Sequence, residues 1–170
     1  FHRDGINLTA AQIGGYVTGT LDATGCDIGV YYGPEAKGSV TGADISGARY
    51  YGVLANAAAV DVTGSAIHNI GDAPFNGNQR GVGVFYTTLA QPNDVKYQNG
   101  DESFVTTGDA ATGTLSGNVI TAYQKTGVAV NGPGASVTVK DNTVTGLGGV
   151  DFIAQNGIQV SRGASGLITG

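Results

Sequence analysis

A five-residue spacing between apolar residues recurs along the chain and constrains its fold more than any other feature. Four pairs show it: Val40 and Ile45, Val62 and Ile67, Leu115 and Ile120, and Val139 and Val144. Between the members of each pair stand an outward Thr, Ser or Lys and then Gly or Asp, which tolerate the backbone of a tight turn. Each segment therefore predicts a short strand, a tight turn and a second short strand.

A second set of short apolar segments accompanies these units and recurs once per unit. Its members begin at Gly5, Asp27, Gly52, Gly81, Gly127 and Gly157, so successive starts differ by 22, 25, 29, 46 and 30 residues. Three short strands cannot bury their apolar faces alone, whereas stacked units form a continuous core with parallel strands about 4.8 Å apart. The sequence therefore predicts an all-β fold, a right-handed parallel β-helix (solenoid) of about five to six coils.

The composition and the chain ends agree with a single solenoid domain over residues 1–170. Thirty glycines disfavour long helices, because glycine weakens helix interiors, and 170 residues suffice for one domain with a core. Both ends stop inside a repeat, and neither shows an amphipathic capping helix. Since an uncapped solenoid exposes strand edges that invite pairing, we expect either a fragment of a longer solenoid or units that stack end to end.

The step of 46 residues indicates an insertion at residues 86–112. The segments VFYTT (84–88) and SFVTT (103–107) are predicted to pair as a protruding hairpin with a polar tip. The acidic residues of this stretch match no metal-binding loop; they are Asp94, Asp101, Glu102 and Asp109. We therefore predict neither a metal site nor a cofactor.

The repeat segments VTGADI, LSGNVI, VKDNTV and NGIQVSRGASGLITG resemble those of the right-handed parallel β-helix proteins of the pectate-lyase-like superfamily. The resemblance covers nearly the whole chain and implies the fold. It does not single out a function, because lyases, hydrolases, epimerases, phage tailspikes and adhesins share the repeat. Catalytic signatures of the superfamily are missing, since the sequence contains no adjacent Asp-Asp, no Asn-Thr-Asp, no Asp-Pro-His and no Arg-x-Pro-x-x-Arg.

Charge and hydropathy restrict the partners and the location of the chain. Thirteen acidic and eight basic residues give a net charge of −5 without a block of either sign, so no nucleic acid is expected as a partner. No apolar run approaches the roughly 20 residues that span a bilayer, so no membrane insertion is expected. The expected location is extracellular or at the cell surface.

One edge of the predicted solenoid holds the first group of candidate carbohydrate-binding residues. Long connections at 68–81 and 145–157 flank a short one at 121–127, and this edge gathers His68, Asp72, Arg80, Tyr123, Lys125, Asp151 and Gln155. A histidine beside carboxylates and cations can bind an acidic sugar or act as a base. Ordinary loop polarity explains the same charges, so both interpretations stay open.

Two aromatic pairs form the second group of candidate carbohydrate-binding residues. Tyr31 and Tyr32 follow one valine as Phe85 and Tyr86 follow another, so the pairs occupy equivalent places two coils apart, separated by about 10 Å. Exposed rings at this interval can stack on the sugars of a glycan chain. Aromatic residues at solenoid corners can equally well cover the core.

Two outward rows complete the predicted surface. One row consists of small or uncharged residues and is expected to form the outer face of one sheet, which we call the predicted floor; its members are Asn7, Gly29, Leu54, Gly83, Ala129 and Gln159. The other row is explained by the β-propensity of Thr and is interrupted by Lys140; its members are Thr18, Thr41, Thr63, Ser116 and Thr169.

The leading prediction for function is a secreted or cell-surface β-helix module with a structural role, a polysaccharide-binding role, or both. Its predicted partner is a polysaccharide or a cell-surface glycan. One alternative is a polysaccharide lyase or glycoside hydrolase that acts at the long-loop edge, and another is a solenoid that self-associates through its ends. Whether the chain is an enzyme stays open, because no catalytic motif is recognised.

Overall fold

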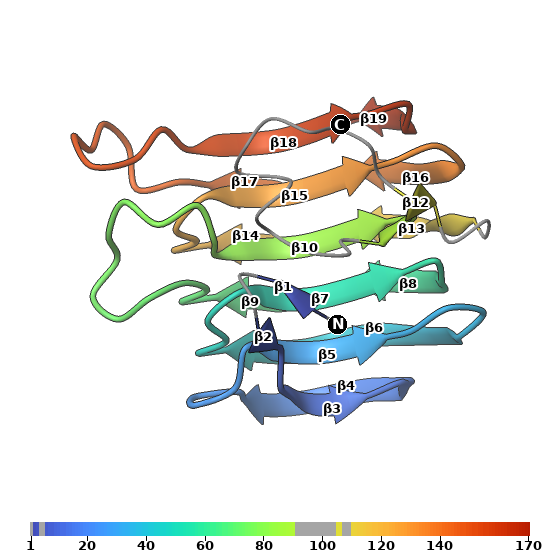
Figure 1. The fold of residues 1–170 in the computed structure, drawn as a ribbon, viewed down its shortest axis with the longest axis horizontal. Coiled ribbons are helices and arrows are strands. Elements are labelled where there is room, and N and C mark those ends of the chain that lie inside the picture. Colours follow the sequence, from blue (N-terminus) through green and yellow to red (C-terminus); the bar gives the residue numbers. More distant parts are fainter. Residues whose placement is uncertain (1, 4–5, 91–104, 107–109) are drawn as a thin grey trace.

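The computed structural model describes residues 2–3, 6–90, 105–106 and 110–170, and in this part the chain winds into stacked coils (Figure 1). A six-stranded parallel sheet forms one wall of the stack. Its strands, in spatial order, are β3 (Ala10–Ile13), β5 (Ile28–Tyr32), β7 (Tyr51–Asn56), β10 (Val82–Thr87), β15 (Thr126–Asn131) and β18 (Asn156–Ser161).

A nine-stranded sheet forms the rest of the wall in two rows. One row contains β4 (Gly15–Asp22), β6 (Lys37–Ser46), β8 (Ala59–Thr63), β13 (Ala111–Ser116), β16 (Ala135–Lys140) and β19 (Ser165–Thr169). The other row joins the end of β6 to β9 (Ala66–His68), β14 (Val119–Thr121) and β17 (Thr143–Thr145). Neighbouring strands of this sheet pair in parallel, so the predicted all-β parallel β-helix is confirmed.

The five-residue spacing forms the core as predicted. Val40, Val62, Leu115 and Val139 lie side by side on neighbouring strands, and they are at most 2% exposed. Ile45, Ile67, Ile120 and Val144 form the next row in the same way. Because each coil places the same apolar positions over those of its neighbour, the core runs without interruption through the stack.

The residue between the two rows adopts a left-handed conformation in every predicted turn. The φ angles are +58° at Gly42, +57° at Gly64, +64° at Gly117 and +54° at Asp141. Glycine and, less readily, aspartate tolerate this conformation. This explains why Gly or Asp stands between the two apolar residues of each pair. We call this side of the solenoid the tight-turn corner.

A ladder of polar side chains stabilises the tight-turn corner. The Ser65 backbone N–H donates to Asn118 Oδ1 at 2.9 Å, and Asn118 Nδ2 donates to Val62 O and to Asn142 Oδ1, both at 2.8 Å. Asn142 Nδ2 continues the ladder with a bond of 2.8 Å to Leu115 O. Asn118 is only 1% exposed, so these bonds satisfy polar groups that water does not reach.

The connections between the short strands and the six-stranded sheet form the opposite side of the solenoid. We call this side the long-loop corner, and it comprises residues 22–27, 46–50, 69–81, 122–125 and 146–155. The two longest connections, 69–81 and 146–155, project from the left side of the stack in Figure 1. This corner carries most of the charged candidate residues.

The beginning of the chain differs from the prediction. The first strand was predicted at Gly5 to Leu8. Its described residues Ile6 and Asn7 form β2 (Ile6–Asn7), which pairs antiparallel with β1 (His2–Arg3) and not with the six-stranded sheet. The sheet begins with β3, whose Gln12 and Ile13 lie beside Val30 and Tyr31. Leu8 packs against the outer surface of that sheet, so its apolar character belongs to a second cluster and not to the main core.

The predicted hairpin is partly visible. Leu89–Ala90 (β11) pairs antiparallel with Val105–Thr106 (β12), whereas residues 84–87 belong to β10 of the six-stranded sheet. The predicted tip and the acidic residues Asp94, Asp101, Glu102 and Asp109 lie outside the described residues. The insertion at 86–112 and the single domain therefore stay predictions. In the described part, no helix is long and apolar enough to cross a membrane.

Candidate functional site

The outer face of the six-stranded sheet carries a row of larger residues than the sequence predicted. Its members lie side by side on successive strands: Tyr31, Leu54, Phe85, Ala129 and Gln159. The predicted floor places Gly29 and Gly83 in this outward row. That assignment is wrong by two residues along each strand, because Tyr31 and Phe85 occupy the row. A Cβ at Gly52 would lie 2.6 Å from Gly83 O and 2.6 Å from Ile67 Cγ2, so glycines stack on glycines and fix the register.

One half of this outer face is closed by an apolar cluster. Six side chains of this cluster are each 8% exposed or less and pack together with Tyr50; they are Leu8, Ile28, Tyr51, Leu54, Val82 and Phe85. The rings of Tyr51 and Phe85 are stacked with centroids 5.2 Å apart. Burial of this many large side chains stabilises the fold by roughly 1.5–3 kcal/mol for each one.

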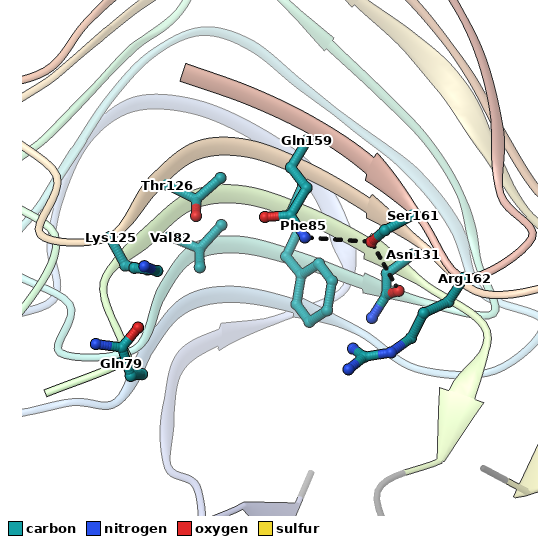
Figure 2. A pocket seen from close by; sticks show the side chains of 10 residues that line it. Gln79, Val82, Phe85, Lys125, Thr126, Asn131, Gln159, Ser161 and Arg162 are labelled. Carbon is teal, nitrogen blue, oxygen red and sulfur yellow. Dashed lines mark hydrogen bonds between the residues drawn. The ribbon is translucent and has the colours of Figure 1, made fainter. Parts of the chain in front are cut away.

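The other half, over β10, β15 and β18, opens into a groove of about 190 Å³ (Figure 2). The small Ala129 creates the hollow between the ring of Phe85 and the side chain of Gln159, which are its neighbours in the row. The groove is lined by Gln79, Val82, Phe85, Lys125, Thr126, Ala129, Asn131, Gln159, Ser161 and Arg162. Two of these, Phe85 and Lys125, are among the residues predicted from the sequence.

Polar atoms follow the rim of the groove in a connected chain. Gln159 Nε2 donates to Ser161 Oγ at 3.3 Å, and Ser161 Oγ donates to Asn131 Oδ1 at 3.2 Å. Lys125 Nζ donates to Ala154 O at 2.7 Å, which holds the ammonium at the other end of the groove. Figure 2 shows these side chains around the hollow, with Lys125 and Arg162 on opposite sides of it.

For Tyr32 and Tyr86 the structure supports the interpretation as core residues and contradicts the exposed rings that carbohydrate binding would require. Both side chains point into the core and are 0% exposed. Tyr32 Oη donates to the backbone oxygen of Gly15 or Ser39, at 3.0 and 3.1 Å, and Tyr86 Oη donates to Val60 O at 2.7 Å. Burial raises the pKa of Tyr32 to about 12 and also raises that of Tyr86.

Tyr31 and Phe85, the first members of these pairs, point outward because side chains alternate along a strand. Tyr31 is half-buried, and its hydroxyl accepts a long hydrogen bond of 3.4 Å from Asn56 Nδ2. Phe85 is 5% exposed and forms the wall between the closed cluster and the groove. The two-residue alternation was therefore the signal that separates the outward rings from the core rings.

The long-loop corner brings Asp72 and Arg80 together, as predicted, in an ion-pair cluster. Arg49 Nε lies 3.0 Å from Asp72 Oδ1, and Arg80 Nε lies 3.3 Å from Asp72 Oδ2. Partial burial acts to raise the pKa of Asp72, but hydrogen bonds from Asn78 and Arg49 outweigh it and the pKa is lowered. Asp72 is therefore ionised near neutral pH and does not act as a proton donor there.

Arg80 completes this cluster through its aromatic neighbour. Its Nη1 donates to the hydroxyl of Tyr50 at 2.7 Å, and its guanidinium carbon lies 4.9 Å from the centre of the Tyr50 ring. Arg49 lies 5.5 Å from the centre of the same ring. These contacts attach loop 69–81 to the closed half of the sheet.

A buried glutamine, which the sequence did not indicate as a site residue, organises loop 69–81. Gln124 Oε1 accepts from the backbone N–H groups of Asp72 and Asn76, at 3.0 and 3.3 Å. Its Nε2 donates to Asn78 O at 2.8 Å. Gln155 fulfils the same task for loop 146–155, since its Oε1 accepts from Leu147 N and its Nε2 donates to Tyr123 O. No periodicity marks these glutamines, because each serves one loop.

The remaining predicted residues do not join the groove. His68 Nε2 lies 2.8 Å from Asp44 Oδ1, and His68 Nδ1 lies 3.0 Å from Asn69 Nδ2, so both ring nitrogens have partners. Asp151 is exposed on loop 146–155. Of the predicted edge residues, Lys125 lines the groove and Asp72 and Arg80 form the ion-pair cluster.

The groove can bind a hydroxyl-rich ligand with anionic groups. Amides and hydroxyls donate to and accept from sugar hydroxyls, and the cations of Lys125 and Arg162 can pair with carboxylates or sulfates. None of the ten described residues that line it is acidic. Among the described residues, no three His, Cys, Asp or Glu side chains are placed to share a metal ion.

Comparison with known proteins gives one match. The family model described as a right-handed β-helix region matches residues 5–169, which is nearly the whole chain. No curated protein and no solved structure matches the chain.

Proposed function

We propose that this chain, which belongs to the right-handed β-helix family, is a secreted or cell-surface module that binds an acidic polysaccharide in the groove over β10, β15 and β18. One observation carries the proposal: the hollow at Ala129 is flanked by Lys125 and Arg162, and no acidic residue is among the described residues that line it. The net charge of the chain is −5, so a described lining with two cations and no carboxylate differs in sign from the chain as a whole.

The shape of the groove supports a polymer as the ligand. A volume of about 190 Å³ is smaller than the roughly 300 Å³ at which closed small-molecule pockets begin. The groove lies on the outer face of the sheet, and we propose that a glycan chain continues along this face beyond the hollow. One sugar ring would occupy the hollow, with its apolar face against Phe85 and Val82 and its substituents toward the polar rim.

The test compares two lysines on different faces of the solenoid. Lys125→Ala removes a groove cation, and Lys140→Ala makes the same change on the nine-stranded sheet, where Lys140 is exposed. Each variant is run through native gels that contain polygalacturonate or a neutral glucan. We expect Lys125→Ala to weaken retention by polygalacturonate roughly fivefold, the equivalent of about 1 kcal/mol for one partly exposed charge pair.

Lys140→Ala is expected to behave like the unmodified chain in the same gels. Equal retention of both lysine variants, or equal retention by the neutral glucan, would contradict an acidic ligand in the groove. Raising the salt concentration should weaken retention of the unmodified chain, because charge pairs at an exposed face are screened.

Catalysis by a lyase or hydrolase at the long-loop edge has less support than binding. The carboxylate of Asp72 is engaged by Arg49, Arg80 and Asn78, and His68 is engaged by Asp44. Incubation with the same glycans, followed by assays for unsaturated or reducing ends, tests this alternative directly. Self-association through the ends stays a prediction, to be tested by sedimentation at increasing concentration.

A further inference from the structure

A second, larger hollow lies on the long-loop corner, on the other side of loop 69–81 from the groove. It is formed between residues 22–27, 46–49 and 69–78, as two overlapping spaces of about 600 and 530 Å³. Gln79 lines the groove, whereas Asn78 lines this hollow, so the loop separates the two. We call it the edge cleft.

The volume of the edge cleft is in the range of roughly 300–1,000 Å³ that is typical for small-molecule sites. The two spaces share six lining residues, so they form one continuous cleft. Its walls combine polar groups with Pro74 and the half-buried ring of Phe75. A mixed lining of one ring and several hydrogen-bonding groups is the chemistry that suits a sugar.

The three carboxylates of the edge cleft differ in what they already bind. Asp27 Oδ2 accepts from the backbone N–H and the hydroxyl of Thr9, at 2.9 and 3.0 Å. Asp72 is engaged by two arginines. Asp22 is exposed, and its Oδ1 accepts from Thr24 N at 2.9 Å. Hydrogen bonds from the side chain and the backbone of Thr24 lower the pKa of Asp22, so its carboxylate is ionised near neutral pH.

Arg49 supplies the donor of the edge cleft. Its side chain lines the cleft and is 47% exposed, while its Nε is paired with Asp72. Asp22 accepts and Arg49 donates, and the Thr24 hydroxyl can do either. The lining contains three carboxylates and one cation, which disfavours anionic ligands. Of the three carboxylates, Asp72 is the one that pairs with arginines, and Asp22 is the exposed one.

We propose that the edge cleft is a second carbohydrate site, which binds a neutral sugar residue through Asp22, Arg49 and the ring of Phe75. This site differs from the groove in the sign of its charge, so the two select different sugars. It does not depend on the function proposed for the groove.

The single cysteine of the chain gives a direct readout. Cys26 lines the edge cleft and is partly exposed, and the sequence contains no other cysteine to compete for a thiol reagent. The rate at which iodoacetamide alkylates Cys26 is measured by mass spectrometry, with and without a defined oligosaccharide. The oligosaccharide is added at about 10 mM, a concentration chosen to exceed the millimolar dissociation constant of a weak sugar site. The probes are a neutral β-glucan hexamer, a galacturonate hexamer and a glucosamine hexamer.

We expect the neutral hexamer to slow alkylation by roughly threefold or more, as when a ligand occupies most of its sites. The galacturonate hexamer should have no effect. Asp22→Ala and Arg49→Gln should each remove the protection, whereas Asp44→Ala, which removes an exposed carboxylate outside the cleft, should keep it. Thermal melting of each variant shows that the fold is intact.

Three results would overturn the proposal. They are an unchanged alkylation rate with the neutral hexamer, equal protection by the acidic hexamer, and protection that survives both Asp22→Ala and Arg49→Gln. Protection by the glucosamine hexamer alone would assign the cleft to a cationic ligand instead. Lys125→Ala should not change the protection of Cys26, so failure of the groove and failure of the cleft are read separately.

Discussion

The tight-turn corner and the long-loop corner are built from the same coils but differ in how the coils relate to one another. At the tight-turn corner, Gly42, Gly64, Gly117 and Asp141 repeat one backbone conformation, and the amide ladder links one coil to the next. At the long-loop corner, each long connection has its own network, around Gln124 in one and Gln155 in the other. The groove and the edge cleft both adjoin the second corner.

The difference teaches where a solenoid can acquire a site. A repeated turn presents the same groups at every level, and it must keep them because the neighbouring coils depend on them. A loop that no other coil copies can change without disturbing the stack, and it can place residues such as Gln79 or Asp72 beside a hollow. The tight-turn corner therefore serves stability, and the long-loop corner is where we propose that ligands bind.

The largest effect on stability is expected at the ladder. Asn118→Ala removes three side-chain hydrogen bonds and leaves the Val62 carbonyl and the Ser65 amide buried without partners, at a cost of about 2–3 kcal/mol. Asn142→Ala, at a more exposed rung, should cost less. Urea unfolding measures both variants. Equal costs would contradict the expectation that burial makes the Asn118 rung the more important one.

A smaller loss of about 1–2 kcal/mol is expected for Gln124→Ala, because loop 69–81 can turn its freed groups toward water. The effect should be local. Hydrogen exchange should quicken at the amides of Asp72 and Asn76, and Gln155→Ala should instead quicken exchange at Leu147. If either variant loosens both loops, the two networks are not independent and the contrast between the corners is weaker.

A cost of about 1 kcal/mol is expected for Gly64→Ala. Its Cβ would meet no atom within 4 Å, so the cost comes from the left-handed backbone alone. The converse change, Asp141→Gly, should stabilise by a similar or smaller amount at the equivalent turn. Unfolding by urea checks the pair, and a stabilising Gly64→Ala would show that this turn does not need its conformation.

The smallest effect is a dependence of stability on pH at the long-loop corner. Partial burial acts to raise the pKa of Asp72 while hydrogen bonds from Asn78 and Arg49 lower it, and the net result is a pKa below 3.8 in the folded chain. The carboxylate therefore contributes stability that is present above pH 3.8 and is lost as the pH falls through the folded pKa. Asp72→Asn should be less stable near neutral pH and lose less stability on acidification. Melting curves between pH 6 and pH 2 test this, and parallel curves would contradict it.

The fold followed from the sequence because its signal is repeated. Val62 and Ile67 carry the same spacing as Leu115 and Ile120, and each copy supports the interpretation of the others. The positive φ angles at Gly64 and Gly117 were predicted for the same reason. The ladder of Asn118 and Asn142 also lies in the repeat, one residue after the turn, but its hydrogen bonds join different coils and no single copy shows them.

The candidate site followed less well, because its residues are not repeated. Lys125 and Phe85 were identified from loop position and aromatic pairing, and both line the groove. Tyr32 and Tyr86 were named as candidates beside the alternative that they cover the core, and the alternation of the strand directs both inward. An error of two residues in aligning β5 and β10 hid the outward row, since Gly29 and Gly83 stood where Tyr31 and Phe85 belong.

The sequence by itself determined the repeat, the parallel strands and the buried rows, because short-range spacing and the stacking of like on like suffice to specify them. Only the tertiary structure decided which half of the six-stranded sheet is open. That depends on Leu8 packing beside Leu54, and on Ala129 lying between Phe85 and Gln159. Such contacts join residues from different coils, and their distances along the chain obey no period that a sequence pattern can show.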